Sequence, residues 1–202
     1  MNDHKAAKPD HPIHQLISER WSPYVFSDRS VSESDLRSVF EAARWAASSY
    51  NEQPWRYIIA TRSNAAEFER MLSCLVEGNQ AWAKNVPVLA IGCTSLRFAL
   101  NGKPNAAAVH DLGLASATLS LEATARGLSV HQMIGILPDK VREIYHVPED
   151  AQPLTALAIG YAADPDTASE EMRKRDLAPR ARKKIAEFVF EGSWGTASGL
   201  VG

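Results

Sequence analysis

Cysteine is scarce in this sequence, and its placement excludes two common uses of the residue. The 202 residues include two cysteines, Cys74 and Cys93. Neither lies in a C-x-x-C pair or beside a cluster of cysteine and histidine, so zinc binding and thioredoxin-like chemistry are not expected. No other metal-ligand spacing occurs, and we expect no bound metal. Both cysteines fall in apolar stretches, which predicts that they are core thiols.

Strong net charge and long apolar runs are also missing. Lysine and arginine number 22 and aspartate and glutamate 24, so the net charge is -2 and the whole chain is not drawn to nucleic acid or to anionic membranes. No apolar run approaches the roughly 20 residues of a membrane span, and the first residues lack the apolar segment of a signal peptide. We therefore expect a soluble cytoplasmic protein with no nucleic-acid or membrane partner, in which any anion site is local.

Two catalytic signatures are absent as well. There is no G-x-G-x-x-G, so a Rossmann dinucleotide site is not indicated. No Ser/His/Asp order is recognisable, and His110 and His131 stand alone. A histidine placed like His131 is more often a loop or surface residue than a catalyst. Motifs alone therefore predict no catalytic side chain.

The chain has enough apolar sequence for one core. Its composition is 45% hydrophobic and 23% charged, which fits a single folded domain at this length. Residues 1–12 are polar and contain two prolines, so we interpret them as a loose leader. Residues 13–190 form the predicted domain, and residues 191–202 a C-terminal tail.

Hydrophobic periodicity predicts alternating helices and strands. Ser32 with Asp35 resembles a capping box, and it opens a helix whose apolar positions recur at i, i+3, i+4 and i+7. The remaining predicted elements are a strand over 55–61, a helix ending near Gly78, a strand over 86–93, a helix over 105–126 capped by Gly127, a loop from 131 into a short helix over 139–145, and a strand over 154–161. The alternation favours α/β or α+β architecture. The helix over 105–126 is rich in small residues, which suits a buried or subunit-facing position.

The most informative stretch is S-S-Y-N-E-Q-P-W, from Ser48 to Trp55. It places the side-chain amides of Asn51 and Gln53 on a loop between a helix and a strand, and Pro54 stiffens that loop. Amides both donate and accept hydrogen bonds, as the polar edge of a flavin ring requires. The alternative is a connecting loop with polar caps.

Three weaker features could hold a phosphate or a flat ring. Arg20 and Ser22 could share one phosphate, although taken alone they fit a solvated helix end better. Arg180 and Arg182, followed by two lysines, indicate a local anion partner or a solvated basic tail. Gly135 allows close backbone approach to a ring, or is a turn glycine.

Taken together and in this order, these features resemble the nitroreductase family. The resemblance covers roughly residues 12–189. Its motifs are R-x-S at Arg20-Trp21-Ser22, S-x-x-N-x-Q-P-W at residues 48–55, Asn79 ahead of Trp82 and Pro87, a long helix ending in Gly127-Leu128, a glycine turn and helix from Gly135 to Glu143, Ile159-Gly160-Tyr161, and R-x-R-K at Arg180, Arg182 and Lys183.

The resemblance implies an α+β fold, with a central mixed sheet flanked by helices, and an intertwined homodimer with FMN at the subunit interface. It also implies that NAD(P)H reduces FMN and leaves before an oxidant takes its place, so the flavin carries the chemistry. The implied phosphate ligands are Arg20, Ser22, Arg180 and Arg182. The ring contacts are Asn79, Ile134 and Gly135, and Ser48, Ser49, Tyr50 and Asn51 come from the other subunit. Trp21 and Gln53 belong to the same cofactor-binding elements.

The sequence departs from the family pattern in two places. Many relatives carry a basic residue where Tyr24 stands, and Phe where Ile136 follows the glycine turn. The choice between NADH and NADPH is therefore open. The expected acceptors are nitroaromatics, quinones or related small molecules. Alternatives are a specialised flavin enzyme of the same fold, such as a flavin-degrading enzyme or a particular dehydrogenase, and a non-catalytic nucleic-acid-binding protein.

Overall fold

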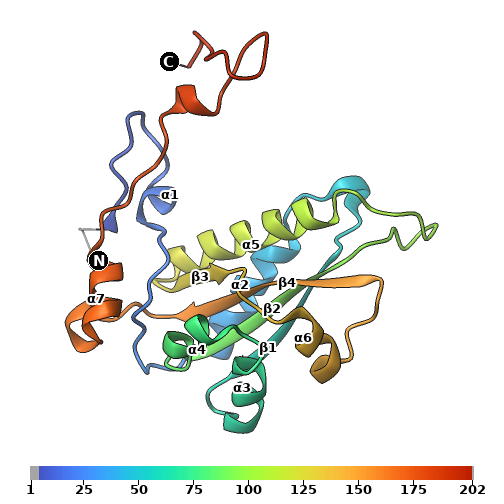
Figure 1. Ribbon diagram of the computed structural model, residues 1–202, viewed down its shortest axis with the longest axis vertical. Helices are drawn as coiled ribbons and strands as arrows, with labels where there is room; N and C mark the ends of the chain where they lie inside the picture. The colour runs from blue at the N-terminus through green and yellow to red at the C-terminus, as the bar shows by residue number, and fades with distance from the viewer. Residues whose placement is uncertain (1–4, 202) are drawn as a thin grey trace.

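The computed structural model describes residues 5–201 and shows helices packed on both faces of one sheet (Figure 1). The elements in chain order are α1 (Gln15–Glu19), α2 (Glu33–Arg44), η2 (Ser49–Asn51), β1 (Trp55–Thr61), α3 (Ala65–Leu72), α4 (Glu77–Ala83), β2 (Val88–Ser95), α5 (Ala108–Ala125), β3 (Ser129–Met133), α6 (Pro138–Tyr145), β4 (Ala151–Gly160), η3 (Pro165–Thr167), α7 (Glu170–Leu177) and η4 (Ile185–Glu187). The α+β fold class is confirmed.

The sheet has the order β1-β2-β4-β3, and every strand pair between the described residues is antiparallel. The prediction of a mixed sheet is therefore wrong for this part of the chain. The physical reason lies in the crossover through α5. It joins β2 to β3, two strands that run in the same direction, but β4 is inserted between them and pairs antiparallel with both.

The core has two layers because the central strands are buried on both faces. Val88 and Ala90 of β2 pack with apolar residues of α2 and α5. The alternate residues Leu89 and Ile91 pack with α3, α4 and α6. This alternation follows from the two-residue period of a strand. The two clusters hold the sheet between a pair of helices on one side and a group of three on the other.

Local signals account for α2 and β1. Ser32 caps α2 by accepting a hydrogen bond from the Asp35 backbone N–H at 3.0 Å, and Val39 and Ala43 are buried as predicted. The strand predicted over 55–61 is β1 with the same bounds. The predicted cap at Gly127 is confirmed by its positive φ of 71°.

Two predicted boundaries are wrong. The helix predicted to stop near Gly78 ends at Leu72, and Gly78 lies inside the next helix, α4. The segment that begins at His131 is not a loop, because residues 129–133 form β3 and pair with β4. Pairing with a neighbouring strand, rather than local propensity, determines this short element.

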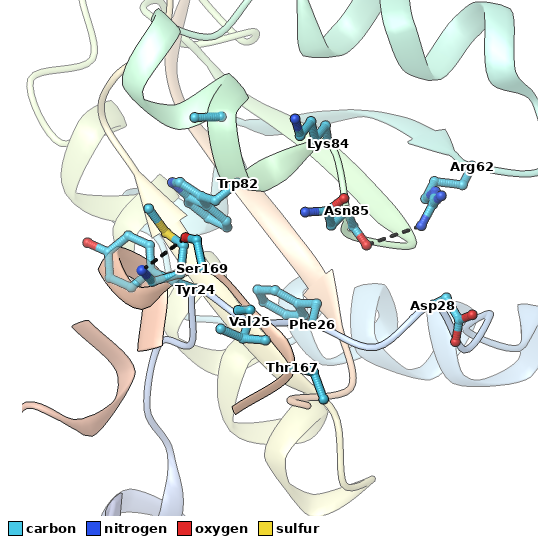
Figure 2. Close-up of a pocket in the computed structure, with 13 residues that line it drawn as sticks. Tyr24, Val25, Phe26, Asp28, Arg62, Trp82, Lys84, Asn85, Thr167 and Ser169 are labelled. Atoms are coloured by element: carbon cyan, nitrogen blue, oxygen red, sulfur yellow. Dashed lines mark hydrogen bonds between the residues drawn. The ribbon is translucent and has the colours of Figure 1, made fainter. Parts of the chain in front are cut away.

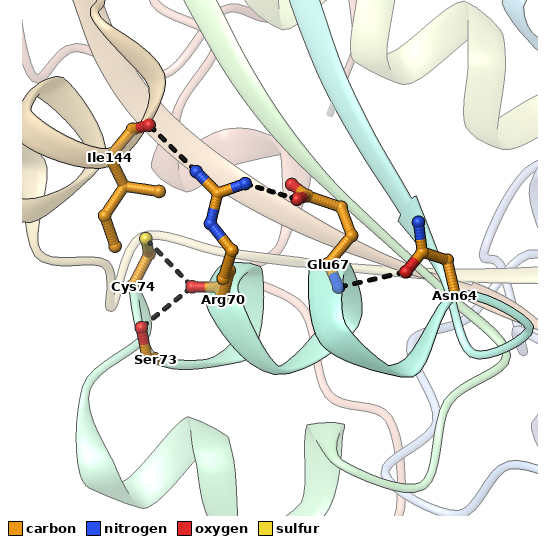
Figure 3. Close-up of polar contacts among 6 residues, drawn as sticks. All are labelled: Asn64, Glu67, Arg70, Ser73, Cys74 and Ile144. Atoms are coloured by element: carbon orange, nitrogen blue, oxygen red, sulfur yellow. Dashed lines mark hydrogen bonds and ion pairs between the residues drawn. The ribbon is translucent and has the colours of Figure 1, made fainter.

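Helix α3 is fixed to α6 by polar contacts at the second face of the sheet (Figure 3). The Arg70 guanidinium donates to the Glu67 carboxylate at 2.6 Å and to the Ile144 carbonyl at 3.1 Å. The Cys74 thiol donates to the Arg70 carbonyl at 3.5 Å and is buried. Both cysteines are buried, as predicted, and burial raises the pKa of Cys93 to about 11.

The N-terminal segment and the segment that follows α7 run side by side, next to α1, whereas the C-terminus lies apart from them at the top of the view (Figure 1). From Lys5 onward the leader is not loose, because Ala7 and Ser18 share a backbone hydrogen bond of 2.9 Å and the Lys5 carbonyl accepts from Arg180 at 2.7 Å. Residues 1–4 lie outside the described part. The C-terminal segment stands away from the sheet and folds back on itself, with a bridge between Phe190 and Ala197.

Candidate functional site

A cluster of positive side chains forms where the N-terminal segment meets the segment that follows α7. Arg20 follows α1, and its guanidinium donates to the Ser22 hydroxyl at 3.2 Å. Arg180 donates to the carbonyls of Lys5 and Ser18, both at 2.7 Å. Burial, and then the charge of the neighbouring Arg182, lowers the pKa of both Arg20 and Arg180. The structure therefore brings together the four residues that the sequence predicted as phosphate ligands.

This cluster has an excess of positive charge. Among residues 5–201, no carboxylate forms an ion pair with Arg20, Arg180 or Arg182. Arg20 and Arg180 are partly buried beside other positive charges that lower their pKa, so an anion between these groups is favoured, because an opposite charge stabilises the protonated forms. The arrangement suits a phosphate group, which the planar guanidinium binds through paired hydrogen bonds.

Lys5 adds a fourth positive charge that the sequence did not single out. Its ammonium donates to the Ala178 carbonyl at 2.6 Å and lies 5.1 Å from the centre of the Trp21 ring. Lys5 is only 5% exposed, and burial lowers its pKa; the Asp176 carboxylate opposes this lowering and the Arg180 charge adds to it. Lys5 thus attaches the segment that carries Arg180 to the element that carries Arg20. A lysine in a polar leader carries no sequence signal for this role.

A second group lies where β3 turns toward α6. The Asn79 side-chain amide, from α4, donates to the Gly135 carbonyl at 3.0 Å, and the Val76 backbone N–H donates to the same oxygen at 3.1 Å. A Cβ at Gly135 would lie 2.5 Å from Asn79 Nδ2, so glycine is required for this close approach. The neighbouring Ile134 is 74% exposed. The structure therefore joins the three residues predicted to contact the ring.

An aromatic cluster connects these two groups. His131, in β3, donates a hydrogen bond from Nδ1–H to the Pro23 carbonyl at 2.8 Å. Its ring lies 4.7 Å from that of Tyr24 and 4.6 Å from that of Trp82 in α4. His131 is not the surface or loop residue that the sequence predicted. Burial lowers its pKa, which keeps the imidazole neutral near pH 7.

Tyr24 has a structural explanation in this cluster. Its ring packs edge-on against the Trp82 ring, with the ring centroids 5.2 Å apart. Its backbone N–H donates to the buried Asp176 carboxylate at 2.8 Å. The Arg175 guanidinium lies 5.1 Å from the centre of the Tyr24 ring, so a positive charge is present beside this position.

The third group is the loop from Ser48 to Gln53. Tyr50, Asn51 and Gln53 all have positive φ angles, between 52° and 55°. Each such residue costs on the order of 1 kcal/mol, since none is glycine. The Gln53 side chain donates to the Asn51 carbonyl at 3.2 Å, and the Gln53 backbone N–H donates to the Ser48 hydroxyl at 3.0 Å. Strain concentrated in one loop in this way is typical of a functional segment, whereas the positive φ of His146 is a single residue at the end of α6.

One chain does not bring this loop to the other two groups. The loop precedes β1, whereas Ile134 and Gly135 follow β3, and these strands are opposite edges of the sheet. Three strand spacings amount to about 14 Å. In Figure 1 the cyan segment before β1 also lies at the end of the fold away from α1, α4 and α7.

A cavity of about 500 Å³ opens beside Trp82, between the 24–28 segment and residues 167–172 (Figure 2). Its labelled lining includes Arg62, Lys84 and Asp28, as well as apolar side chains. None of the predicted cofactor residues lines it. The predicted site and this cavity are therefore separate features of the fold.

Residues 5–201 contain neither a metal-binding cluster of side chains nor a helix that could span a membrane. No group of three or more His, Cys, Asp or Glu side chains is arranged to hold a metal ion. No helix in that range combines the length and the apolar character needed to cross a bilayer.

Comparison with known proteins identifies a family and several relatives. The model of the Nitroreductase family matches residues 17–161. An uncharacterized 15.4 kDa protein of Mycolicibacterium smegmatis is 36% identical over 88 residues, which are 44% of this chain and 59% of that protein. A protein of Archaeoglobus fulgidus, provisionally named NADH dehydrogenase/NAD(P)H nitroreductase, is 26% identical over 155 residues, 74% of this chain and 85% of its own length.

Among solved structures, one resembles nearly the whole chain. A crystal structure of an oxidoreductase containing FMN superposes with a TM-score of 0.89 and 29% sequence identity. The match covers 97% of this chain and 100% of that one.

Proposed function

The chain belongs to the nitroreductase family and is an oxidoreductase, and from this premise we propose that it is an FMN-dependent enzyme that uses NAD(P)H to reduce nitroaromatics, quinones or related acceptors. The observation that carries the proposal is the cluster of Arg20, Arg180 and Arg182, which no carboxylate of residues 5–201 neutralises. A phosphate is the anion that such a cluster suits best.

The described residues fit FMN at both ends of the cofactor. Arg20, Ser22 and Arg182 would hold the phosphate, and Arg180 would position the segment that carries Arg182, since its Nη1 joins that segment to the backbone carbonyls of Lys5 and Ser18. Asn79 and the backbone at Gly135 would meet the ring. The exposed Ile134 side chain beside them would exclude water from one side of it.

When bound, FMN supplies the redox chemistry: hydride transfer from NAD(P)H and, after that product leaves, reduction of an acceptor in its place. The protein contributes binding and orientation. Asn79 Nδ2 donates to the Gly135 carbonyl, which fixes the direction of its amide. The neutral His131 ring, packed on Trp82, keeps α4 and β3 at a constant separation between the two ends of the site.

We further propose that the enzyme is a homodimer in which the loop from Ser48 to Gln53 reaches the cofactor of the partner subunit. The separation of this loop from Gly135 across the sheet supports the proposal. So does the C-terminal segment, which exposes large apolar side chains: Phe188 is 58%, Trp194 94% and Leu200 84% exposed. An isologous contact with a second copy would bury such side chains.

A visible absorption spectrum of the purified protein tests the function. We expect a yellow protein with about one FMN per chain, bleached by NADH or NADPH and reoxidised by a quinone or a nitroaromatic. Protein that stays colourless after incubation with FMN would contradict the proposal. Light scattering of the FMN-loaded protein tests the assembly, and a monomer mass at micromolar concentration would refute the dimer.

A further inference from the structure

The loop from Ser48 to Gln53 is held in a strained conformation by contacts from outside the loop. Tyr50, Asn51 and Gln53 have positive φ angles, which non-glycine residues adopt only when their surroundings determine them. Internal hydrogen bonds to Ser48 and Asn51 are too local to fix the loop on the domain.

The first external contact is a buried carboxylate. Asp111 lies in the first turn of α5 and is only 1% exposed. Its Oδ2 accepts a hydrogen bond from the Ser49 backbone N–H at 3.0 Å, and its Oδ1 lies 3.1 Å from His110 Nδ1. Because α5 packs along the sheet through Leu112 and Ala115, this carboxylate is a rigid attachment point. Asp111 is the buried carboxylate of this helix, since Glu122, the other acidic residue of α5, is partly exposed.

The second external contact comes from the other side of the loop. The Glu52 carboxylate accepts from the Ala99 backbone N–H at 2.8 Å, in the segment that connects β2 to α5. The Tyr50 ring also packs edge-on against Phe98 in that segment, with centroids 5.8 Å apart. The loop is therefore held between α5 and the segment that leads into it.

We propose that Asp111 and Glu52 are positioning residues that fix the loop in the conformation that contacts the FMN of the partner subunit. This inference rests on the proposed function. The geometry assigns the larger role to Asp111, because its carboxylate is buried whereas Glu52 is partly exposed. Neither residue touches the cofactor, and both act through the backbone of the loop.

The test uses the FMN-loaded dimer and four variants. Asp111→Ala removes the buried acceptor, and Asp111→Asn retains an oxygen that can accept from Ser49. Glu52→Ala removes the second contact at a position where a fold defect is not expected. Ser120→Ala is the matched control, because Ser120 is also buried in α5 but bonds Ser116 and Gln132 rather than the loop. FMN affinity, the visible circular dichroism of bound flavin and its reduction potential are measured for each.

We expect Asp111→Ala to weaken FMN binding by about 10-fold or more, the effect of losing one hydrogen bond to a charged group. Its flavin spectrum and potential should shift, Asp111→Asn should restore both toward wild type, and Glu52→Ala should weaken FMN by roughly threefold or more. A purely structural role would lower thermal stability in Asp111→Ala and Ser120→Ala alike without moving the spectrum or potential of bound flavin.

Wild-type FMN affinity and reduction potential in Asp111→Ala would overturn the inference. So would changes of FMN affinity and potential in Ser120→Ala as large as those in Asp111→Ala. If Asp111→Ala does not fold, unchanged FMN affinity, circular dichroism and potential in Glu52→Ala would overturn it. Failure of the proposed function is a different result, since the wild-type protein would then bind no FMN at all.

Discussion

Removing the Arg182 guanidinium is expected to weaken FMN binding while sparing the fold. Arg182 is exposed, and its guanidinium donates to the carbonyl of the adjacent Ala181 at 2.7 Å. Losing a charge-assisted contact with a phosphate costs about 1.5–3 kcal/mol, or roughly 10- to 150-fold in affinity. Arg182→Ala should show this loss in a titration that follows quenching of flavin fluorescence, with an unchanged midpoint of thermal unfolding.

Two comparisons separate a direct contact from a general charge effect. Lys183→Ala removes one positive charge from the next residue, which is also exposed, so it should change FMN affinity little because exposed charges are screened. Riboflavin lacks the phosphate, and its binding should be nearly the same in wild type and Arg182→Ala. Equal losses in Arg182→Ala and Lys183→Ala, or an equal loss for riboflavin, would refute the contact.

A double variant tests whether Arg182 and Arg20 act on one phosphate. Side chains that share a ligand show non-additive losses, whereas independent sites add within about 0.5 kcal/mol. We expect the combined Arg20→Ala and Arg182→Ala loss to differ from the sum of the single losses by more than that. Arg180→Ala should behave differently from Arg182→Ala, because Arg180 bonds two backbone carbonyls and its removal should also lower stability.

Three other predictions concern stability and reactivity. Gly135→Ala should cost about 1–3 kcal/mol in denaturant unfolding, because its Cβ would lie 2.5 Å from Asn79 Nδ2, whereas Gly113→Ala in α5 meets open space and should stabilise by up to about 1 kcal/mol. Burial lowers the pKa of His131, so as the pH drops through about 6.5 the imidazole is protonated in the unfolded chain before it is protonated in the folded one, and the free energy of unfolding falls. His131→Asn should therefore reduce the dependence of the free energy of unfolding on pH. Cys93, with its pKa raised to about 11, should react with a thiol reagent in native protein no faster than the chain opens, and a rapid native reaction would contradict its burial.

Local sequence signals correctly predicted the helices and strands whose conformation is determined by their own residues. The Ser32 cap and its apolar period placed α2, and the β-branched and aromatic run placed β1. Strand β3 was missed because His131 and Gln132 interrupt its apolar pattern, and its extended conformation depends on pairing with β4. Sheet order was equally inaccessible, since nothing in the sequence of β4 indicates that it lies between β2 and β3.

The candidate site also combines features that the sequence could predict with features that depend on contacts between distant segments. Motifs identified arginines, amides and a glycine of the right chemistry, because these residue types are needed wherever a phosphate and a ring are bound. The motifs could not show that Arg180 Nη1 bonds the carbonyls of two distant residues, Lys5 and Ser18, whereas Arg182 Nη1 bonds only the carbonyl of the adjacent Ala181. This difference favours a positioning role for Arg180 and a ligand role for Arg182. Lys5 and Asp111 were missed because each acts on a segment far away in the sequence.

The division of the site between two sheet edges has a consequence that mixed dimers can test. If the loop serves the partner's cofactor, each of the two sites combines the phosphate cluster of one subunit with the loop of the other. A dimer of one Arg182→Ala subunit and one Asp111→Ala subunit then has one site with both defects and one with neither. Tagged copies of the two variants, co-expressed and purified as the mixed dimer, should therefore bind one FMN per dimer with wild-type affinity. If the loop instead served its own subunit, every site in the mixed dimer would carry one defect, and no wild-type affinity would be recovered.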